Sequence, residues 1–366
     1  MSEQGPLAIL VAGGTGGHLF PAQALGEELI SRGFRIHLMT DHRVRDYGKD
    51  FPAEMVHIIP SATVSMSDPL RIPSRALILV RGILSARKVF KQYRPNVVAG
   101  FGGYPSFPPL MAAGLMKIPT MLHEQNAVVG RANKFLARMA TRIALSFPKT
   151  AGIEDDGARV RVTGNPVRAM VLPFKATPYP GLANDGPIRV VVFGGSQGAK
   201  FFSDFMPGVF SAMEPGIRAR VKLTQQCRPE DIERTAAALG AMDIKSDLSA
   251  FFSNLPERIA DAHLVICRSG ASTIAELGVI GRPAVMVPLP HALDNDQLRN
   301  AESFAAAGAG WVHPQATLAA DRFAAFLGTL LCDENRLKSA ATAALSHGKP
   351  GAAKNLADLA QSVMIS

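Results

Sequence analysis

The sequence predicts an α/β protein built from two doubly wound domains with mostly parallel sheets, and three observations support this prediction. Two apolar segments, LAILVAGGTGGH at residues 7–18 and IRVVVFGGSQGA at residues 188–199, each lead into a glycine-rich turn and a helical pattern. Short apolar runs alternate with helical patterns in both halves of the chain, as in βαβ units. The length of 366 residues exceeds what one core usually supports. We therefore expect two Rossmann-like domains facing a cleft.

The first domain is expected at residues 1–168. Its strands are predicted where short apolar runs are bounded by turn residues, at residues 7–12, 35–39, 55–59, 96–99, 120–123 and 143–147. Residues 169–187 are expected to form a linker, because they hold four prolines without apolar periodicity.

The second domain is expected at residues 188–348, with strands near residues 188–193, 220–224, 264–267 and 284–288. From Leu318 onward the sequence is rich in alanine and helical in pattern, with a break at Lys349, Pro350 and Gly351. A last helix is therefore expected within residues 349–366.

Composition limits the compartment and the partners. The net charge of +9 predicts attraction to polyanions, which include nucleic acid, anionic lipid and phosphorylated metabolites. Cys227, Cys267 and Cys332 are widely spaced, so neither a disulfide framework nor a zinc site is expected and a cytoplasmic protein is favoured. The N-terminus lacks the pattern of a signal peptide. No apolar run reaches the roughly 20 residues of a membrane-spanning helix, so any membrane association should be peripheral.

The two glycine-rich turns are candidate phosphate sites. Glycines let backbone amides crowd around an anion, and a helix N-terminus adds partial positive charge. The first turn offers Thr15, Gly16 and Gly17, with His18 beside them, and the second offers the Ser196 hydroxyl. Leu19 stands where a dinucleotide fingerprint needs its third glycine. A tight turn without a ligand is the alternative at both places.

RSGASTIAELG, at residues 268–278, again leads from a strand into a helix. Glu276 could accept both hydroxyl hydrogens of a ribose, while Ser272 and Thr273 face phosphates. Alternatively, Glu276 only stabilises the positive end of the helix.

HEQN at residues 123–126 places four polar side chains after a strand, which favours substrate contact over a plain surface loop. GNPVR ends at Arg168, which could reach a diphosphate across the cleft or simply be solvated.

Asp294 and Asp296 form a DxD triplet, and such carboxylates can hold a divalent metal. Because the triplet opens a helical pattern, a capping role is favoured, with Gln297 as the better ligand contact.

Residues 70–94 are basic and amphipathic, and no acidic residue interrupts them. Such a helix can lie on an anionic membrane surface. A helix packed on its own sheet with a solvated basic face is the alternative. Nucleic acid is not expected as a partner, because Tyr93 is the one aromatic side chain suited to stacking on bases.

Seven motifs in this order, GGTGGHLFPA, FGGYPSFPPL, HEQNAVVGRANK, GNPVR, GGSQGA, RSGASTIAELG and PLPHALDNDQLRNA, resemble the MurG family. Its members are peripheral N-acetylglucosaminyltransferases that convert lipid I to lipid II at the cytoplasmic face of the inner membrane. The resemblance covers nearly the whole chain. It implies a GT-B fold, with UDP-GlcNAc held chiefly by the C-terminal domain and the undecaprenyl-linked acceptor by the N-terminal one. It also implies that the last helix, within residues 349–366, returns to pack on the N-terminal domain.

The resemblance also implies roles for single residues. Glu276 would contact the uridine ribose, Arg168 the diphosphate, and Asn126 and Gln297 the GlcNAc unit. The backbone at Phe252 would contact uracil, although many relatives have an aliphatic residue there. The implied substrate-binding set is Thr15, Gly16, Gly17, Asn126, Arg168, Ser196, Phe252, Ala271, Ser272, Thr273, Ile274, Ala275, Glu276 and Gln297.

The implied reaction is an inverting transfer of GlcNAc to the C4 hydroxyl of the MurNAc unit, which needs one general base. His18 is the expected base, with His123 and Glu124 as alternates. Helix dipoles and Arg168 can neutralise the leaving diphosphate, so neither a metal nor a cofactor is expected.

Three alternatives stay open at this point. Another UDP-sugar enzyme, such as a lipid glycosyltransferase or a UDP-GlcNAc 2-epimerase, would use the same fold. An NAD-dependent oxidoreductase would use Asp41 as its ribose-binding acid. A non-catalytic module would bind membrane or nucleic acid through residues 70–94.

Overall fold

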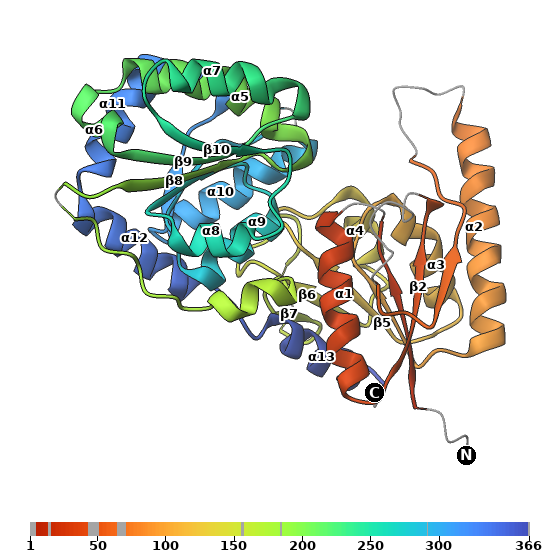
Figure 1. The fold of residues 1–366 in the computed structure, drawn as a ribbon. Helices are drawn as coiled ribbons and strands as arrows, with labels where there is room; N and C mark the ends of the chain where they lie inside the picture. The colour runs from red at the N-terminus through yellow and green to blue at the C-terminus, as the bar shows by residue number, and fades with distance from the viewer. Residues whose placement is uncertain are drawn as a thin grey trace. The chain divides into compact units, whose positions relative to one another are not determined.

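The structure is a computed structural model that describes residues 5–13, 16–42, 51–63, 71–154, 157–183, 185–290 and 292–364, without the side chains of residues 196–198 and 293. The chain divides into two compact units, Met1–Arg168 with Lys349–Ser366, and Ala169–Gly348 (Figure 1). We call them unit 1 and unit 2 and describe each by itself.

Unit 1 is built on a seven-stranded parallel sheet with the strand order β3-β2-β1-β4-β5-β6-β7. The order reverses between β1 and β4, which makes this place the switch point where ligands bind in such sheets. The strands are β1 (Leu7–Val11), β2 (Arg35–Thr40), β3 (Met55–Ile58), β4 (Val97–Gly100), β5 (Thr120–Glu124), β6 (Arg142–Leu145) and β7 (Val160–Val162).

Helices cover both faces of this sheet because its central strands are apolar on both sides. Ala8 and Leu10 belong to a core with α1 (Gly16–Ser31) and α13 (Ala352–Ser362), whereas Ile9 and Val11 belong to a core with α2 (Ile72–Tyr93), α3 (Phe107–Leu115) and α4 (Arg131–Leu136). Figure 1 shows α13, in blue, beside α1, in red. Arg32 fixes this pair, since its Nη1 donates to Asp358 Oδ1 at 2.7 Å.

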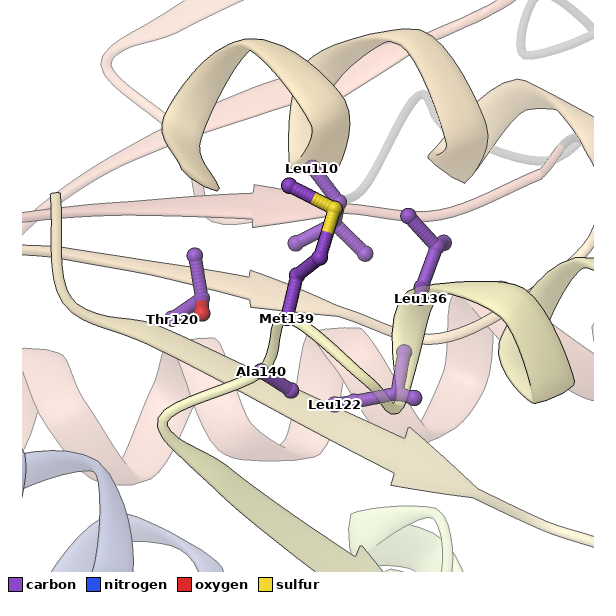
Figure 2. Close-up of a pocket in the computed structure, with 6 residues that line it drawn as sticks. All are labelled: Leu110, Thr120, Leu122, Leu136, Met139 and Ala140. Atoms are coloured by element: carbon purple, nitrogen blue, oxygen red, sulfur yellow. The ribbon is translucent and has the colours of Figure 1, made fainter. Parts of the chain in front are cut away.

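A small void in unit 1 lies between α3, β5 and the end of α4 (Figure 2). It is lined by Leu110, Thr120, Leu122, Leu136, Met139 and Ala140. Thr120 Oγ1 already accepts from the backbone N–H of Thr141 at 3.1 Å. With no free polar group to orient a ligand, this void is a packing feature of the core.

Unit 2 is built on a six-stranded parallel sheet with the order β10-β9-β8-β11-β12-β13. The strands are β8 (Ile188–Phe193), β9 (Val221–Gln226), β10 (Lys245–Ser249), β11 (Leu264–Cys267), β12 (Ala284–Met286) and β13 (Gly310–Val312). The helices are α5 (Gly195–Ala212), α6 (Pro215–Arg220), α7 (Ile232–Gly240), α8 (Leu255–Asp261), α9 (Ala271–Ile280), α10 (Asp296–Ala306), α11 (Ala320–Leu331) and α12 (Glu334–His347).

The segment expected as a linker, residues 169–187, lies within unit 2. It begins with a 3-10 helix, η4 (Ala169–Phe174), that packs on α8 and α9. The buried Arg282 guanidinium then donates to the carbonyls of Thr177 and Pro178 at 3.0 and 2.9 Å. His263 holds the next turn through its Nε2, 3.2 Å from Gly181 O. These bonds attach the proline-rich segment along its length.

The predicted α/β class and parallel sheets are confirmed, and all ten predicted strands are present within a few residues of the expected bounds. Three further strands, β7, β10 and β13, were not predicted. Among the residues described, no helix combines the length and apolarity that crossing a bilayer requires.

Candidate active site

In unit 1, the predicted site residues gather at the carboxyl ends of β1, β4 and β5, because parallel strands end at one edge of the sheet. After β1, Gly16 and Gly17 open α1 and place the half-buried His18 in its first turn. After β5 come Gln125 and Asn126. The predicted contact Thr15 lies outside the described residues.

A glycine pair after β4 lies against His18. Gly102 and Gly103 both have left-handed φ angles, 84° and 72°, which glycine adopts without strain. A Cβ at Gly102 would stand 3.1 Å from Asn133 Nδ2 and 3.5 Å from His18 Cδ2, and one at Gly103 would stand 3.5 Å from His18 Cε1. The missing side chains therefore let this turn approach the imidazole.

Two side chains hold this turn in place. The hydroxyl of Ser106 donates to Gly102 O at 2.6 Å. The hydroxyl of Tyr104 donates to Asp41 Oδ2 at 2.9 Å. Asp41, the ribose-binding acid of the oxidoreductase alternative, is thus buried and bonded to a tyrosine.

Glu124 is buried at the end of β5 and organises the loop that follows. Its carboxylate accepts from the backbone N–H groups of Asn126 and Gly130, both at 3.0 Å, and from Asn133 Nδ2 at 2.8 Å. Burial raises the pKa of this carboxyl, and these hydrogen bonds oppose the rise. Both carboxylate oxygens therefore stabilise the loop that contains Asn126 and leads to α4.

His123 is fully buried and hydrogen-bonded at both ring nitrogens. Its Nε2 lies 3.1 Å from Gly164 O, which can only accept, so Nε2 carries the proton. Its Nδ1 accepts from Gln125 Nε2 at 2.9 Å. Burial lowers the pKa of His123 to about 4. The imidazole is therefore neutral at physiological pH and ties β5 to the GNPVR loop.

The GNPVR loop ends at Arg168, which is half-buried. Its guanidinium lies over the ring of Phe20, 5.5 Å from the centroid. Phe20 belongs to α1, so Arg168 lies at the same edge of unit 1 as the glycine turn.

In unit 2, the helices α5 and α9 begin at the carboxyl ends of β8 and β11. Gly195 opens α5 with a φ of 64°. The predicted contact Ser196 has a side chain outside the described residues. The residue before α9 is Gly270, so no side chain caps the first N–H groups of this helix. The buried Ser272 Oγ has no hydrogen-bond partner among the described residues. Ala271, Ser272 and Thr273 thus form a first turn with donors suited to an anion.

Glu276 and Gln297 belong to this same edge of unit 2. Glu276 lies one turn into α9 and is 7% exposed. Ser269 Oγ donates to Gln297 O at 2.7 Å. The side-chain Oε1 of Gln297 accepts from Leu289 N at 3.0 Å, which fixes the direction of its amide.

The DxD triplet runs from the 3-10 turn η6 (Leu293–Asn295) into the start of α10. Asp296 is the first residue of this helix, and its Oδ1 accepts from the backbone N–H of Gln297 at 2.7 Å, as an acid at a helix start does. Burial raises the pKa of Asp296. Within the part of the chain that the structure describes, no three His, Cys, Asp or Glu side chains are grouped to hold a metal ion.

Two residues at this edge escaped the sequence prediction. Arg268, directly after β11, is buried and donates to Val287 O at 2.9 Å and to Gln315 Oε1 at 2.6 Å. Phe251 is 73% exposed, whereas Arg258 covers the ring of the predicted Phe252 at 4.4 Å. The position of Arg268 at a strand end was visible in the sequence, but its burial was not.

Comparison with known proteins shows the family of the chain. Residues 8–145 match the glycosyltransferase family 28 N-terminal domain and residues 189–356 match the C-terminal domain of that family. A Rhizobium etli protein named UDP-N-acetylglucosamine–N-acetylmuramyl-(pentapeptide) pyrophosphoryl-undecaprenol N-acetylglucosamine transferase is 46% identical over 98% of this chain and 95% of its own. A Brucella abortus protein of the same name is 48% identical over 99% of this chain and 95% of its own.

Among solved structures, the crystal structure of Acinetobacter baumannii MurG has a TM-score of 0.79 with 29% identity, over 98% of this chain and 100% of that one. The match therefore extends through both units. The chain belongs to glycosyltransferase family 28.

Proposed function

We propose that the protein transfers GlcNAc from UDP-GlcNAc to the C4 hydroxyl of the MurNAc unit of lipid I, giving lipid II for peptidoglycan. The observation that supports this most strongly is the identity of 46–48% to transferases of that name over nearly the whole chain. The other UDP-sugar enzymes considered above share the architecture but lack this support.

Unit 2 binds the donor in this proposal. The first turn of α9 meets the diphosphate through the backbone N–H groups of residues 271–273 and the unpartnered hydroxyl of Ser272. Glu276 accepts the ribose hydroxyls, and Gln297 presents its amide N–H to GlcNAc. The glycine turn with Ser196 adds further donors, and the backbone at Phe252 meets the uracil edge.

Unit 1 supplies the base. His18 lies half-buried in the first turn of α1, at the carboxyl end of β1 and against the Gly102–Gly103 pair. Both nitrogens of His123 and both oxygens of Glu124 hold the loops around them through hydrogen bonds within the chain. We therefore assign proton abstraction to His18 and positioning to the other two. Asn126, held by Glu124, contacts GlcNAc, and residues 15–17 line the acceptor site.

The bond changes follow from these roles. His18 takes the C4 hydroxyl proton while the C4 oxygen bonds to the anomeric carbon from the face opposite UDP. The bond from that carbon to the β-phosphate oxygen breaks, and its electron pair leaves with UDP. Arg168 and the α9 N-terminus stabilise the charge on the diphosphate. The reaction inverts the anomeric centre and needs no cofactor.

The test is transfer of labelled GlcNAc to a lipid I analogue in detergent. We expect His18→Gln to lower kcat by about 100-fold to 10,000-fold, the usual contribution of a general base. Glu276→Ala should instead raise KM for UDP-GlcNAc and leave KM for the acceptor unchanged. Turnover of UDP-GlcNAc without acceptor would overturn the proposal in favour of an epimerase.

The membrane surface is a second part of the proposal. On α2, three apolar side chains are more than half exposed: Leu77 (51%), Val80 (51%) and Leu84 (58%). Their spacing of three and four residues puts them on one face of the helix. Exposed basic residues lie among and beyond them, including Arg81, Arg87, Lys88 and Lys91. An apolar stripe with cations at its side suits an anionic bilayer, with about 1 kcal/mol for each near-surface cation.

Vesicle sedimentation tests this surface. Leu77→Gln with Leu84→Gln should reduce binding to vesicles containing anionic phospholipid while transfer to a detergent-solubilised acceptor persists. Leu345→Gln, which changes an exposed leucine of unit 2, is the control. If the double variant of α2 bound these vesicles as well as the wild type does, the proposal for α2 would be refuted. Peripheral attachment to the inner membrane would then have to use another surface of the protein.

A further inference from the structure

The chain passes from unit 2 to unit 1 between Gly348 and Lys349, and we call residues 348–355 the junction. Within unit 2, Gly348 packs on α9, the helix assigned to the donor diphosphate. Within unit 1, Lys349 and Asn355 contact the start of the GNPVR loop, which ends at Arg168. The junction therefore contacts two elements that carry predicted substrate contacts.

In unit 2, Gly348 approaches α9 more closely than a residue with a side chain could. A Cβ at this position would stand 2.4 Å from Gly278 O and 2.9 Å from Val279 N. Ordinary contacts of a Cβ begin at 3.4 Å, so the methyl group of an alanine would be about 1 Å too close. The backbone angles of Gly348, φ −61° and ψ 145°, are open to every residue type. Glycine is thus needed here for space, two residues beyond Glu276 on α9.

In unit 1, Gly164 is the point at which the GNPVR loop meets the junction. Its φ is 86°, and a Cβ there would stand 2.6 Å from Lys349 Cβ. Asn355 adds a hydrogen bond, since its Nδ2 donates to Thr163 O at 3.3 Å. Two consecutive residues at the start of the loop are therefore held by the junction.

The opposite side of the same loop is held by β5. Gly164 O accepts from His123 Nε2 at 3.1 Å. Arg168 follows four residues later, and its guanidinium lies over the ring of Phe20. Because the loop is fixed from two sides at Gly164, its start determines where the backbone of Arg168 lies.

The contacts of the junction bury little apolar surface. Lys349 and Asn355 are exposed, and Gly348 is half-buried. The apolar attachment of the C-terminal helix lies further along, at Leu356 and Ala360, which belong to the core shared with α1. Since hydrophobic stabilisation scales with buried apolar area, the junction adds little to stability. Its close contacts at backbone atoms restrict the position of α9 and of the loop instead.

We propose that the junction is a positioning element of the active site. Gly348 sets the position of α9 in unit 2, whereas Lys349 and Asn355 set the position of the GNPVR loop, and hence of Arg168, in unit 1. This inference rests on the proposed function, which assigns the donor diphosphate to α9 and Arg168. The three junction residues act through the elements that they contact and are not catalytic residues.

The first experiment measures the binding of UDP to the full chain by isothermal titration calorimetry. Gly348→Ala should raise the Kd of UDP about 10-fold, as for the loss of one hydrogen bond to a charged group, because α9 is displaced. Gly351→Ala is the matched control in the same segment, since a Cβ there meets no described atom within 4 Å, and it should leave the Kd unchanged. If Gly348→Ala does not fold, Gly278→Ala crowds the same contact more gently, with its Cβ 3.0 Å from Gly348 Cα. An unchanged Kd in the folded variant would overturn the proposal.

The second experiment measures amide hydrogen exchange of the loop without substrate. Lys349→Gly with Asn355→Ala removes the contacts of the junction with the loop, so exchange in residues 163–168 should become about 10-fold faster. The control is Arg32→Met, which loosens the C-terminal helix at Asp358 instead and should leave exchange in the loop unchanged. Equal exchange in the double variant and the wild type would overturn the proposal.

GlcNAc transfer to a lipid I analogue then tests whether the junction acts through Arg168. The double variant should lower kcat/KM about 10-fold when Arg168 is present and less than about twofold in an Arg168→Ala background. Arg32→Met should leave kcat/KM unchanged. An equal loss in both backgrounds would overturn the positioning role. If the wild type neither bound UDP nor transferred GlcNAc, the proposed function would fall instead, and the exchange comparison would still test the support of the loop.

Discussion

Replacing His123 with glutamine tests the network that joins β5 to the GNPVR loop. Glutamine places an N–H near the position of imidazole Nε2, so the bond to Gly164 O can persist while the titratable group is removed. Any change in the pH dependence of stability then reports the imidazole itself. The wild-type His123 has a pKa of about 4 because burial disfavours its charged form, against an ordinary value of 6.5.

The sign follows from proton linkage. The unfolded chain binds a proton at His123 near pH 6.5, and the folded chain does so only near pH 4, so acid favours unfolding between these values. The contribution of His123 to stability is complete above pH 6.5 and is lost as the pH falls toward 4. One pKa unit corresponds to about 1.36 kcal/mol. The full loss is therefore about 3 kcal/mol, of which about 2 kcal/mol is lost by pH 5.

The assay is urea unfolding of both proteins between pH 7.5 and pH 4.5. Circular dichroism follows both units, whereas the fluorescence of Trp311, on β13, follows unit 2 alone. We expect the unit 1 transition of His123→Gln to fall less steeply with acid than that of the wild type, by about 2 kcal/mol at pH 5. His37 and His57 also have lowered pKa values from burial, but they are common to both proteins. Parallel curves would refute the argument that His123 is held neutral.

Three more changes test other parts of the structure. Gly102→Ala should destabilise unit 1 by about 1–2 kcal/mol and reduce GlcNAc transfer, because φ is 84° and the added methyl group would press on Asn133. Thermal unfolding measures the loss, and the control is Gly240→Ala, where a Cβ meets nothing within 4 Å. Arg268→Met should cost unit 2 about 3 kcal/mol in Trp311-monitored unfolding, since two carbonyls and Gln315 lose their donor, and an unchanged midpoint would contradict this. GlcNAc transfer should persist when a chelator removes divalent ions from the assay. Loss of transfer under the chelator would show that a metal ion helps to stabilise the leaving diphosphate.

The sequence alone determined the strands at the centre of each sheet and the chemistry at their ends. Buried parallel strands are continuous apolar runs, so β1, β4, β8 and β11 can be predicted from their own residues, without knowledge of the strands they pair with. The turns after them are equally local, since glycine-rich loops and the polar segments HEQN and RSGAST follow their strands directly. The order of these motifs was enough to indicate the family.

Only the tertiary structure decided the edges and the division of roles. Strands β7 and β13 have three residues each, and β10 is largely exposed. They are strands because a neighbouring strand supplies hydrogen bonds, which no local pattern records. In the sequence, His18 was the expected base, and His123 and Glu124 were its alternates. The structure gives His123 and Glu124 positioning roles, because both nitrogens of the imidazole and both oxygens of the carboxylate are bonded within the chain. Hydrogen-bond partners distant in sequence decide both cases, since burial and pairing are properties of the assembled fold.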